Sequence, residues 1–213
     1  MKLLRTVAAV IWAGVATATA QSDEEASAVI DTYLKALQIL ELPEGRQMLA
    51  QVAWPNCGSA GMSGTATTLP TVTKTETIFQ TRFETDVPAV PGFKRVVNCE
   101  VKTDAMQPTS EKYLVVAYPD NITKKWKVLC FIRLQNFDEA TAYTLRHLND
   151  TAYGTPSVAH RFLAFQYSAA GKLRLASATY RKAAELNRTQ PTKYAPQSQF
   201  DMMVTAFDRI IPK

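Results

Sequence analysis

The sequence predicts an α+β protein in which an N-terminal helix packs on an antiparallel sheet and a helical hairpin with a capping helix follows. Three observations lead to this prediction. Apolar residues recur at steps of three and four in residues 23–42, alternate with polar residues in parts of 71–133, and return to helical steps in 156–211. Because a helix and a sheet each bury an apolar face, we expect the first helix to cover the sheet.

The first twenty residues have the order of a secretory signal peptide. Lys2 and Arg5 precede a short apolar stretch, small residues end it at Ala20, and an acidic segment follows. The stretch is too short to span a membrane, and no cysteine follows the cleavage site to carry a lipid. We therefore expect cleavage after Ala20, export to the periplasm or the extracellular space, and no stable membrane anchor. Retention as an uncleaved anchor is the alternative.

The charge of the chain argues against a nucleic-acid partner. The net charge is +5, and loss of Lys2 and Arg5 with the leader lowers it to +3. Such a small balance, spread along the chain, lacks the basic footprint of a nucleic-acid-binding protein. The densest basic cluster, Lys124–Lys127, follows a turn-like segment, which favours the solvated start of a strand over a site for an anionic partner.

The mature chain divides into two regions, residues 21–135 with helix and sheet and residues 136–213 with helices only. The first region begins at a capping box formed by Ser22 and Glu25, and its helix continues to about Leu42. A short second helix follows, and then a loop rich in glycine, serine, threonine and proline that ends at residue 70.

Four segments after this loop have the composition of strands. They are rich in β-branched and aromatic residues, and a short turn between the last two predicts a β-hairpin. The predicted strands are 71–87, 94–103, 113–118 and 125–133.

A helix followed by long antiparallel strands resembles, in element order, the cystatin-like and nuclear-transport-factor-2-like domains, in which a curved sheet wraps a helix. This resemblance implies a pocket between the helix and the sheet, with Tyr33, Trp54 or Trp126 at its mouth. The alternative is an interior filled by side chains. A small-ligand binding protein is therefore the second functional hypothesis.

Residues 156–189 have the spacing of a helical hairpin. Thr155 before Pro156 is typical of a helix start, and Gly171 suits the left-handed residue that ends a helix. Small residues allow the two helices to approach closely, and bulky residues fill the space between them. The residues with this spacing are Leu163, Ala164, Tyr167, Gly171, Ala176, Tyr180 and Ala183.

This order of bulky and small positions resembles a single tetratricopeptide repeat, although His160 and Arg188 replace its usual tryptophan and proline. A lone repeat needs neighbours to bury its apolar face, so we expect a capping helix after Pro196. The resemblance implies a protein or peptide partner on the concave face of the first helix. The polar residues expected to line that face are Arg161, Gln166 and Ser168. The alternative is a set of packed helices without a binding groove.

The chain has three cysteines, an odd number for an exported protein. Cys99 and Cys130 lie in predicted strands and are the preferred disulfide, Cys57 could instead pair with either, and buried thiols are the remaining alternative. His147 and His160 lack the carboxylate-rich partners of a metal site. We therefore expect no metal and no cofactor.

The sequence contains no clear catalytic motif. Its serines lack the strand-to-helix turn of a nucleophile elbow, which leaves a hydrolase with dispersed active-site residues as the third hypothesis. The sequence favours an exported, non-enzymatic binding or scaffold protein that mediates protein–protein interaction.

Overall fold

The computed structural model describes most of the chain beyond residue 21. The described residues are 22–54, 59–60, 71–102, 109–134, 137–150, 154–192 and 195–212. The predicted leader and Cys57 lie outside these residues. Within the described ranges, no helix is long and apolar enough to cross a membrane.

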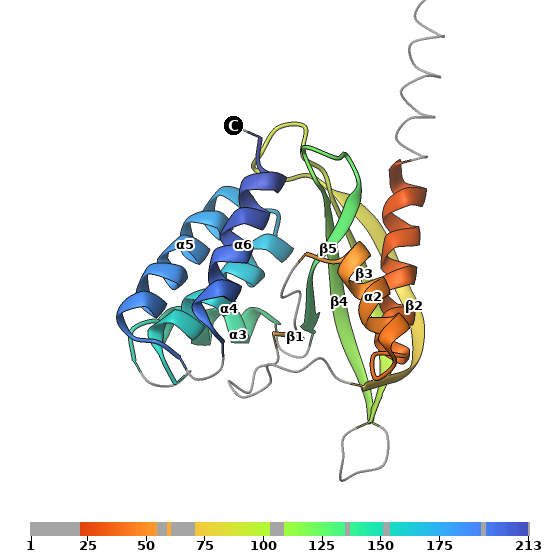
Figure 1. Ribbon diagram of the computed structural model, residues 1–213, viewed down its shortest axis with the longest axis horizontal. Coiled ribbons are helices and arrows are strands. Elements are labelled where there is room, and N and C mark those ends of the chain that lie inside the picture. The colour runs from red at the N-terminus through yellow and green to blue at the C-terminus, as the bar shows by residue number, and fades with distance from the viewer. Residues whose placement is uncertain are drawn as a thin grey trace, which may run out of the picture.

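A five-stranded sheet lies in the middle of the molecule (Figure 1). Its strand order is β1-β5-β4-β3-β2, and neighbouring strands are antiparallel except that β1 pairs in parallel with β5. The strands are β1 (Ser59–Ala60), β2 (Thr71–Phe83), β3 (Gly92–Lys102), β4 (Thr109–Pro119) and β5 (Trp126–Arg133). The predicted α+β class is confirmed, and β4 and β5 form the predicted hairpin.

Two helices cover one face of the sheet, drawn on the right in Figure 1. The first spans residues 22–38 and ends before Leu42, and α2 follows at Pro43–Val52. The apolar stripe of the first helix packs on strand residues of this face, where the Tyr113 and Phe131 rings stack with centroids 4.2 Å apart. The buried residues of this core include Ile30, Tyr33, Leu37, Val97, Cys99, Val115 and Val128.

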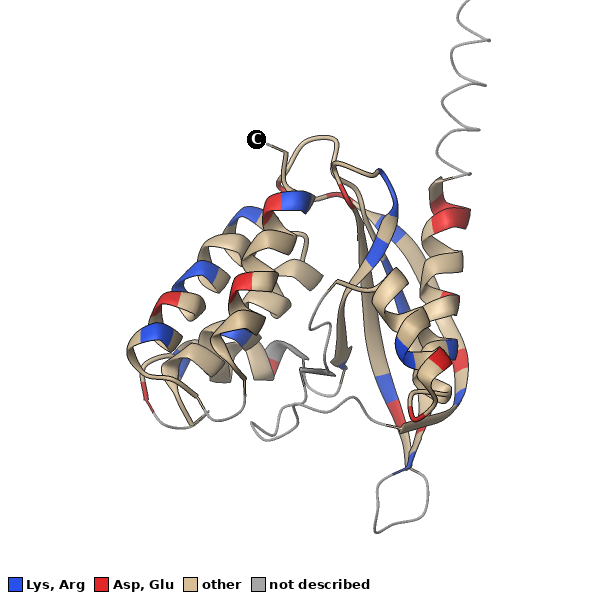
Figure 2. Ribbon diagram, viewed as in Figure 1, with Lys and Arg blue, Asp and Glu red and all other residues tan. Residues whose placement is uncertain are grey.

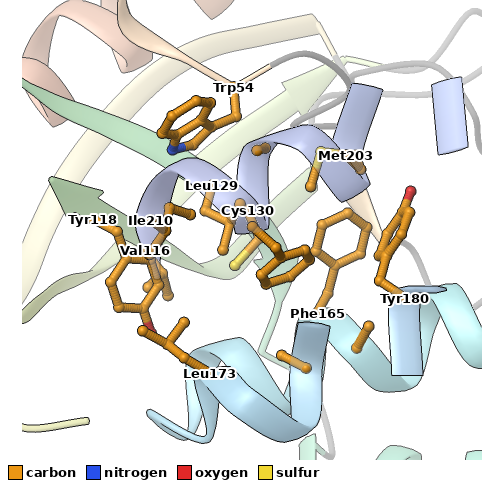
Figure 3. Packing of buried hydrophobic residues seen from close by; sticks show 14 of the residues in the cluster. Trp54, Val116, Tyr118, Leu129, Cys130, Phe165, Leu173, Tyr180, Met203 and Ile210 are labelled. Atoms are coloured by element: carbon orange, nitrogen blue, oxygen red, sulfur yellow. The ribbon is translucent and has the colours of Figure 1, made fainter. Parts of the chain in front are cut away.

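The C-terminal helices are α3 (Phe137–Arg146), α4 (Pro156–Ala169), α5 (Leu173–Thr189) and α6 (Gln197–Ile210). Helices α4 to α6 cover the opposite face of the sheet, and α3 packs against α4. Helices α4 to α6 share one core with β4 and β5, and Figure 3 shows its side chains meeting between the two layers. The predicted hairpin and capping helix are confirmed, whereas α3 is not predicted. Two of the large apolar residues of α3, Tyr143 and Leu145, are 42% and 47% exposed. The sequence of α3 therefore lacks the apolar stripe by which a packed helix is recognised.

Strands β4 and β5 are therefore buried on both faces. Residues from Tyr113 to Tyr118 are all buried, and alternate ones belong to the two cores. A sheet covered on both faces has strands that read as continuous apolar runs, as this segment does. The regions 21–135 and 136–213 consequently pack through a common sheet.

Gly171 joins the helical hairpin to the end of β2. Its φ of +75° is a left-handed conformation, and a Cβ at this position would lie 2.7 Å from the Glu84 carbonyl oxygen. The Gly171 carbonyl accepts a 3.0 Å hydrogen bond from the Asp86 backbone N–H. Glycine is required here because both the backbone conformation and the close approach exclude a side chain.

Tyr118 links the sheet to α4 inside the second core. Its side chain is fully buried, and its hydroxyl donates a hydrogen bond to the Ser168 carbonyl. A buried polar group that lacks a partner costs stability, so this bond fixes where α4 lies on the sheet.

A charged contact holds α6 to the turn between β4 and β5. The fully buried Asp120 carboxylate accepts hydrogen bonds from the Ile122 backbone N–H at 3.0 Å and from the Arg209 guanidinium. The Arg209 guanidinium also lies 5.5 Å from the centre of the Trp54 ring. Burial alone raises the pKa of Asp120, but the hydrogen bonds from Ile122, Thr123 and Arg209 outweigh it and hold the pKa below its usual value.

The substitution Tyr118→Phe removes the hydroxyl and leaves the ring in place. We expect it to lower the free energy of unfolding by about 1–2 kcal/mol, because a buried hydrogen bond is lost without creating a large cavity. Denaturant unfolding measures this change. Tyr167→Phe, at a half-buried tyrosine of α4, is the control and should change stability by less than about 0.5 kcal/mol. Equal effects of the two substitutions would contradict the structural role of Tyr118.

The substitution Asp120→Asn should lower the free energy of unfolding at pH 7 by roughly 1–3 kcal/mol, because the charged hydrogen bonds are lost. The contribution of Asp120 is present above the usual carboxyl pKa and is lost as the pH falls through its lowered folded-state pKa. The difference in unfolding free energy between the wild type and the variant should therefore be present at pH 7 and shrink at acidic pH. Asp208→Asn, in the exposed Arg181–Asp208 pair, is the matched control and should have little effect. A difference between wild type and Asp120→Asn that is independent of pH would contradict this assignment.

Candidate functional site

The three residues predicted to line a ligand pocket are buried in packed cores. Tyr33 of the first helix and Trp126 of β5 lie in the core between that helix and the sheet, with ring centroids 5.9 Å from Phe131 and 6.4 Å from Phe93, respectively. Trp54 belongs to the core on the other face of the sheet and is 3% exposed. The three side chains therefore do not share one pocket mouth, and the packing corrects that expectation.

The face of the hairpin predicted to bind a partner is turned inward. Ser168 is fully buried and its hydroxyl donates to the Ala164 carbonyl, while Gln166 is 9% exposed. Arg161 is half-buried, with its guanidinium 6.0 Å from the centre of the Phe165 ring. The structure corrects the expectation of an open docking face, because α4 uses its apolar residues to pack against the sheet.

The preferred disulfide is also corrected. Cys99 lies in the core beneath the first helix, whereas Cys130 lies in the core beneath α4 to α6. The two thiols are thus on opposite faces of the sheet, strand β4 also separates their two strands, and they are not joined to each other. Burial, and secondarily the charge of Glu111, raises the pKa of the Cys99 thiol to about 12. A thiol with so high a pKa is a poor nucleophile at neutral pH.

A cleft of about 470 Å³ lies at the end of the β4–β5 pair. Glu111 and Arg133 form an ion pair of 2.7 Å at this cleft, and the Tyr113 hydroxyl donates to Glu111 at 2.8 Å. Burial and these contacts with Glu111 raise the pKa of Tyr113. Because Glu111 already accepts from Arg133 and Tyr113, this cluster ties the ends of two strands together, and its one carboxylate is engaged within the fold.

A second cleft, of about 570 Å³, lies between the first helix and the upper part of β2 and β3. The arginine that lines it is Arg82, which lies 3.2 Å from the Asp23 carboxylate and donates to the Ser22 hydroxyl at 3.0 Å. Three other lining residues accept hydrogen bonds from Arg95, which is 3% exposed: Gln80 at 2.8 Å, the Ser27 hydroxyl at 2.6 Å and Asp31. Every one of these partners belongs to the same chain. Arg95 thus holds the helix to the sheet, with its hydrogen-bonding capacity used within the fold.

The histidines do not assemble a catalytic site among the described residues. His147 Nδ1 lies 2.6 Å from Asp150, as in the orienting pair of a hydrolase triad, but no described serine or cysteine hydrogen-bonds to its other ring nitrogen. His160 Nδ1 contacts the Pro156 carbonyl of its own helix at 2.8 Å. Within the same ranges, no three residues of the His, Cys, Asp and Glu types come together in a way that could hold a metal ion.

Strand β2 is an open edge of the sheet. It extends over 13 residues and pairs with β3 on one side, and no strand in the described part of the chain pairs with its other side. Most residues from Thr73 to Thr81 are exposed, and Ile78 and Phe79 are each 48% exposed. An edge strand presents unpaired N–H and C=O groups, so β2 can accept a further strand.

Two bulges limit where such pairing can be regular. The register between β2 and β3 shifts between Val72 and Lys74 and again between Thr77 and Phe79. Bulges increase the local twist and are one means by which proteins restrict edge pairing. The segment Lys74–Thr77 between them keeps a continuous register with β3.

The sequence alone did not single out this edge. Threonine-rich composition identified residues 71–87 as a strand, but neither composition nor period states which strand lies at the edge of a sheet. Two adjacent apolar residues, Ile78 and Phe79, interrupt the alternation of a half-buried strand and were the available signal.

No family model, curated protein or solved structure matches this chain. The tetratricopeptide and cystatin-like resemblances therefore stay predictions.

The Cys99 thiol provides a test of the burial described above. At pH 8 we expect Cys99 to resist a small alkylating reagent in the folded protein and to react after unfolding, because burial both blocks access and raises its pKa to about 12. Mass spectrometry of the peptide that contains Cys99 measures the labelled fraction. Labelling of Cys99 at equal rates in the folded and unfolded protein would contradict the structure of this core.

Proposed function

We propose that this chain is an exported, non-enzymatic binding or scaffold protein that contacts another polypeptide through the edge of β2. The observation that supports this proposal is the exposure of this edge over most of a 13-residue strand, with Ile78 and Phe79 each 48% exposed. Most strands in globular proteins are about half as long, and natural edges are usually shortened, charged or covered.

The chemistry of an edge strand favours a protein partner. An added strand receives main-chain hydrogen bonds from the edge, and exposed side chains of alternate residues supply selectivity. Ile78 and Phe79 would lose water-exposed apolar surface on contact, which favours association. The proposal therefore assigns main-chain pairing as the source of affinity and these two residues as apolar anchors.

The other two hypotheses have less support. The packing of Tyr33, Trp54 and Trp126 fills the space in which a small ligand was expected. The raised pKa values of Cys99, Tyr113 and Tyr180 favour the neutral forms of these groups, whereas acid–base catalysis works best with pKa values near the operating pH.

Export and a protein partner form one consistent proposal. The order of charged, apolar and small residues before Ala20 supports export to the periplasm or the extracellular space. Figure 2 shows Lys and Arg interspersed with Asp and Glu over the helices and strands, which supports a polypeptide partner over a nucleic acid.

Site-specific photocrosslinking tests the proposed surface. A photoreactive phenylalanine analogue in place of Phe79 should give a discrete adduct when the full chain is produced and illuminated in its native cells. The same analogue in place of Leu175 on α5, which is 44% exposed, is the control of matched exposure. We expect an adduct at position 79 and none of comparable yield at position 175.

A second variant checks that the adduct depends on the edge. Ile78→Lys adds a charge beside the reactive position, and we expect it to lower the adduct yield several-fold without changing the thermal unfolding temperature appreciably, because the residue is exposed. Absence of an adduct at position 79, or equal yields at both positions, would overturn the proposed function.

A further inference from the structure

The exposed edge of β2 has a sequence that is nearly symmetric about one residue. On either side of Thr75 stand Lys74 and Glu76, followed by Thr73 and Thr77. The two central neighbours have opposite charges, and the next two are identical. A strand with this pattern presents complementary groups to a copy of itself that runs in the opposite direction.

Strand geometry selects the register of such a pair. Backbone N–H and C=O groups of successive residues point to alternate edges, so residues that face each other across an antiparallel edge must have the same orientation, both toward the partner strand or both away from it. A two-fold pair is therefore centred on a residue. Centring on Thr75 places Lys74 of one copy opposite Glu76 of the other, twice in each dimer, and residues that face each other lie on the same face of the sheet.

The two charges are available for this contact. Both Lys74 and Glu76 are exposed, and neither forms an ion pair with any other described residue. The side-chain hydrogen bonds between the first helix and β2 lie at Gln80 and Arg82, beyond this segment. The segment Lys74–Thr77 also lies between the two bulges and has a continuous register with β3.

We infer that the partner at the β2 edge is a second copy of this chain, paired antiparallel about Thr75 to give one continuous sheet through the dimer. This inference rests on the proposed function, because it names the polypeptide that occupies the same edge. The Lys74–Glu76 pairs set the register, and main-chain hydrogen bonds hold the strands together. The exposed Ile78 and Phe79 lie beside the paired segment and come under the second copy on association.

Because the edge-to-edge contact is short, we expect a weak dimer. It buries less surface than the roughly 1,200–2,000 Å² of stable complexes, so we expect a dissociation constant of about micromolar order. A monomer–dimer equilibrium in this range is measured by analytical ultracentrifugation of the purified protein over a series of concentrations.

Charge-reversal variants test the register. In Lys74→Glu two carboxylates face each other at each pair, and in Glu76→Lys two ammonium groups do. Each variant alone should weaken dimerisation at least about ten-fold, since two attractive cross-strand pairs become repulsive. An equimolar mixture of the two variants restores opposite charges at both pairs and should form a heterodimer with near wild-type affinity. Lys35→Glu, on the exposed side of the first helix, is the control of equal charge change and should dimerise as the wild type does.

Recovery of association in the mixture distinguishes a broken dimer contact from a variant that has lost its fold. Lys74 faces Glu100 of β3 in the register, so Lys74→Glu can lower stability as well, and thermal unfolding of each variant is recorded beside its association. A protein that stays monomeric at concentrations far above micromolar overturns the inference, as does a dimer that neither single variant weakens or a mixture that fails to associate. The proposed function fails separately, because it requires an adduct at position 79. An adduct with twice the mass of the chain supports a second copy as the partner. An adduct of another mass retains the proposed function but overturns the second copy.

Discussion

Burial of β4 and β5 on both faces is the constraint on which the other layers depend. The first helix and α2 bury their apolar residues against one face of the sheet. Helices α4 to α6 bury most of their bulky side chains against each other and against the other face of β4 and β5. Because residues of a strand alternate between faces, β4 and β5 contribute to both cores at once. Loss of their pairing would expose apolar surface in both layers.

A few polar contacts fix the positions of these layers. Arg95 joins the first helix to β3, the Tyr118 hydroxyl joins β4 to α4, and Asp120 joins the β4–β5 turn to α6. Apolar contact is largely non-directional, and it tolerates small shifts of one layer over another. Hydrogen bonds to buried groups do not, because a displaced donor leaves its partner unsatisfied. The apolar cores therefore supply most of the stability, and these contacts supply the alignment.

The same arrangement decides which surfaces remain for function. Covering both faces of the central strands closes the helix–sheet interior and the inward side of α4, the two places where a ligand or a partner was expected. What a covered sheet still exposes is its edge, where hydrogen bonding is unfilled. In this chain β2 occupies that edge with a long strand, and its charges are arranged so that a second copy complements them.

The sequence by itself determined the local elements. Periodicity and composition located the first helix, the β4–β5 hairpin, the α4–α5 hairpin and the capping helix α6. The residues of the pattern from Leu163 to Ala183 are mostly buried. Period and composition describe one segment at a time, so they could not state which surface covers which. Only the tertiary structure decided that Cys99 and Cys130 lie on opposite faces, that Ser168 points inward, and that β2 is the edge. These properties depend on strand order and on packing between segments far apart in the chain, and no local pattern encodes them.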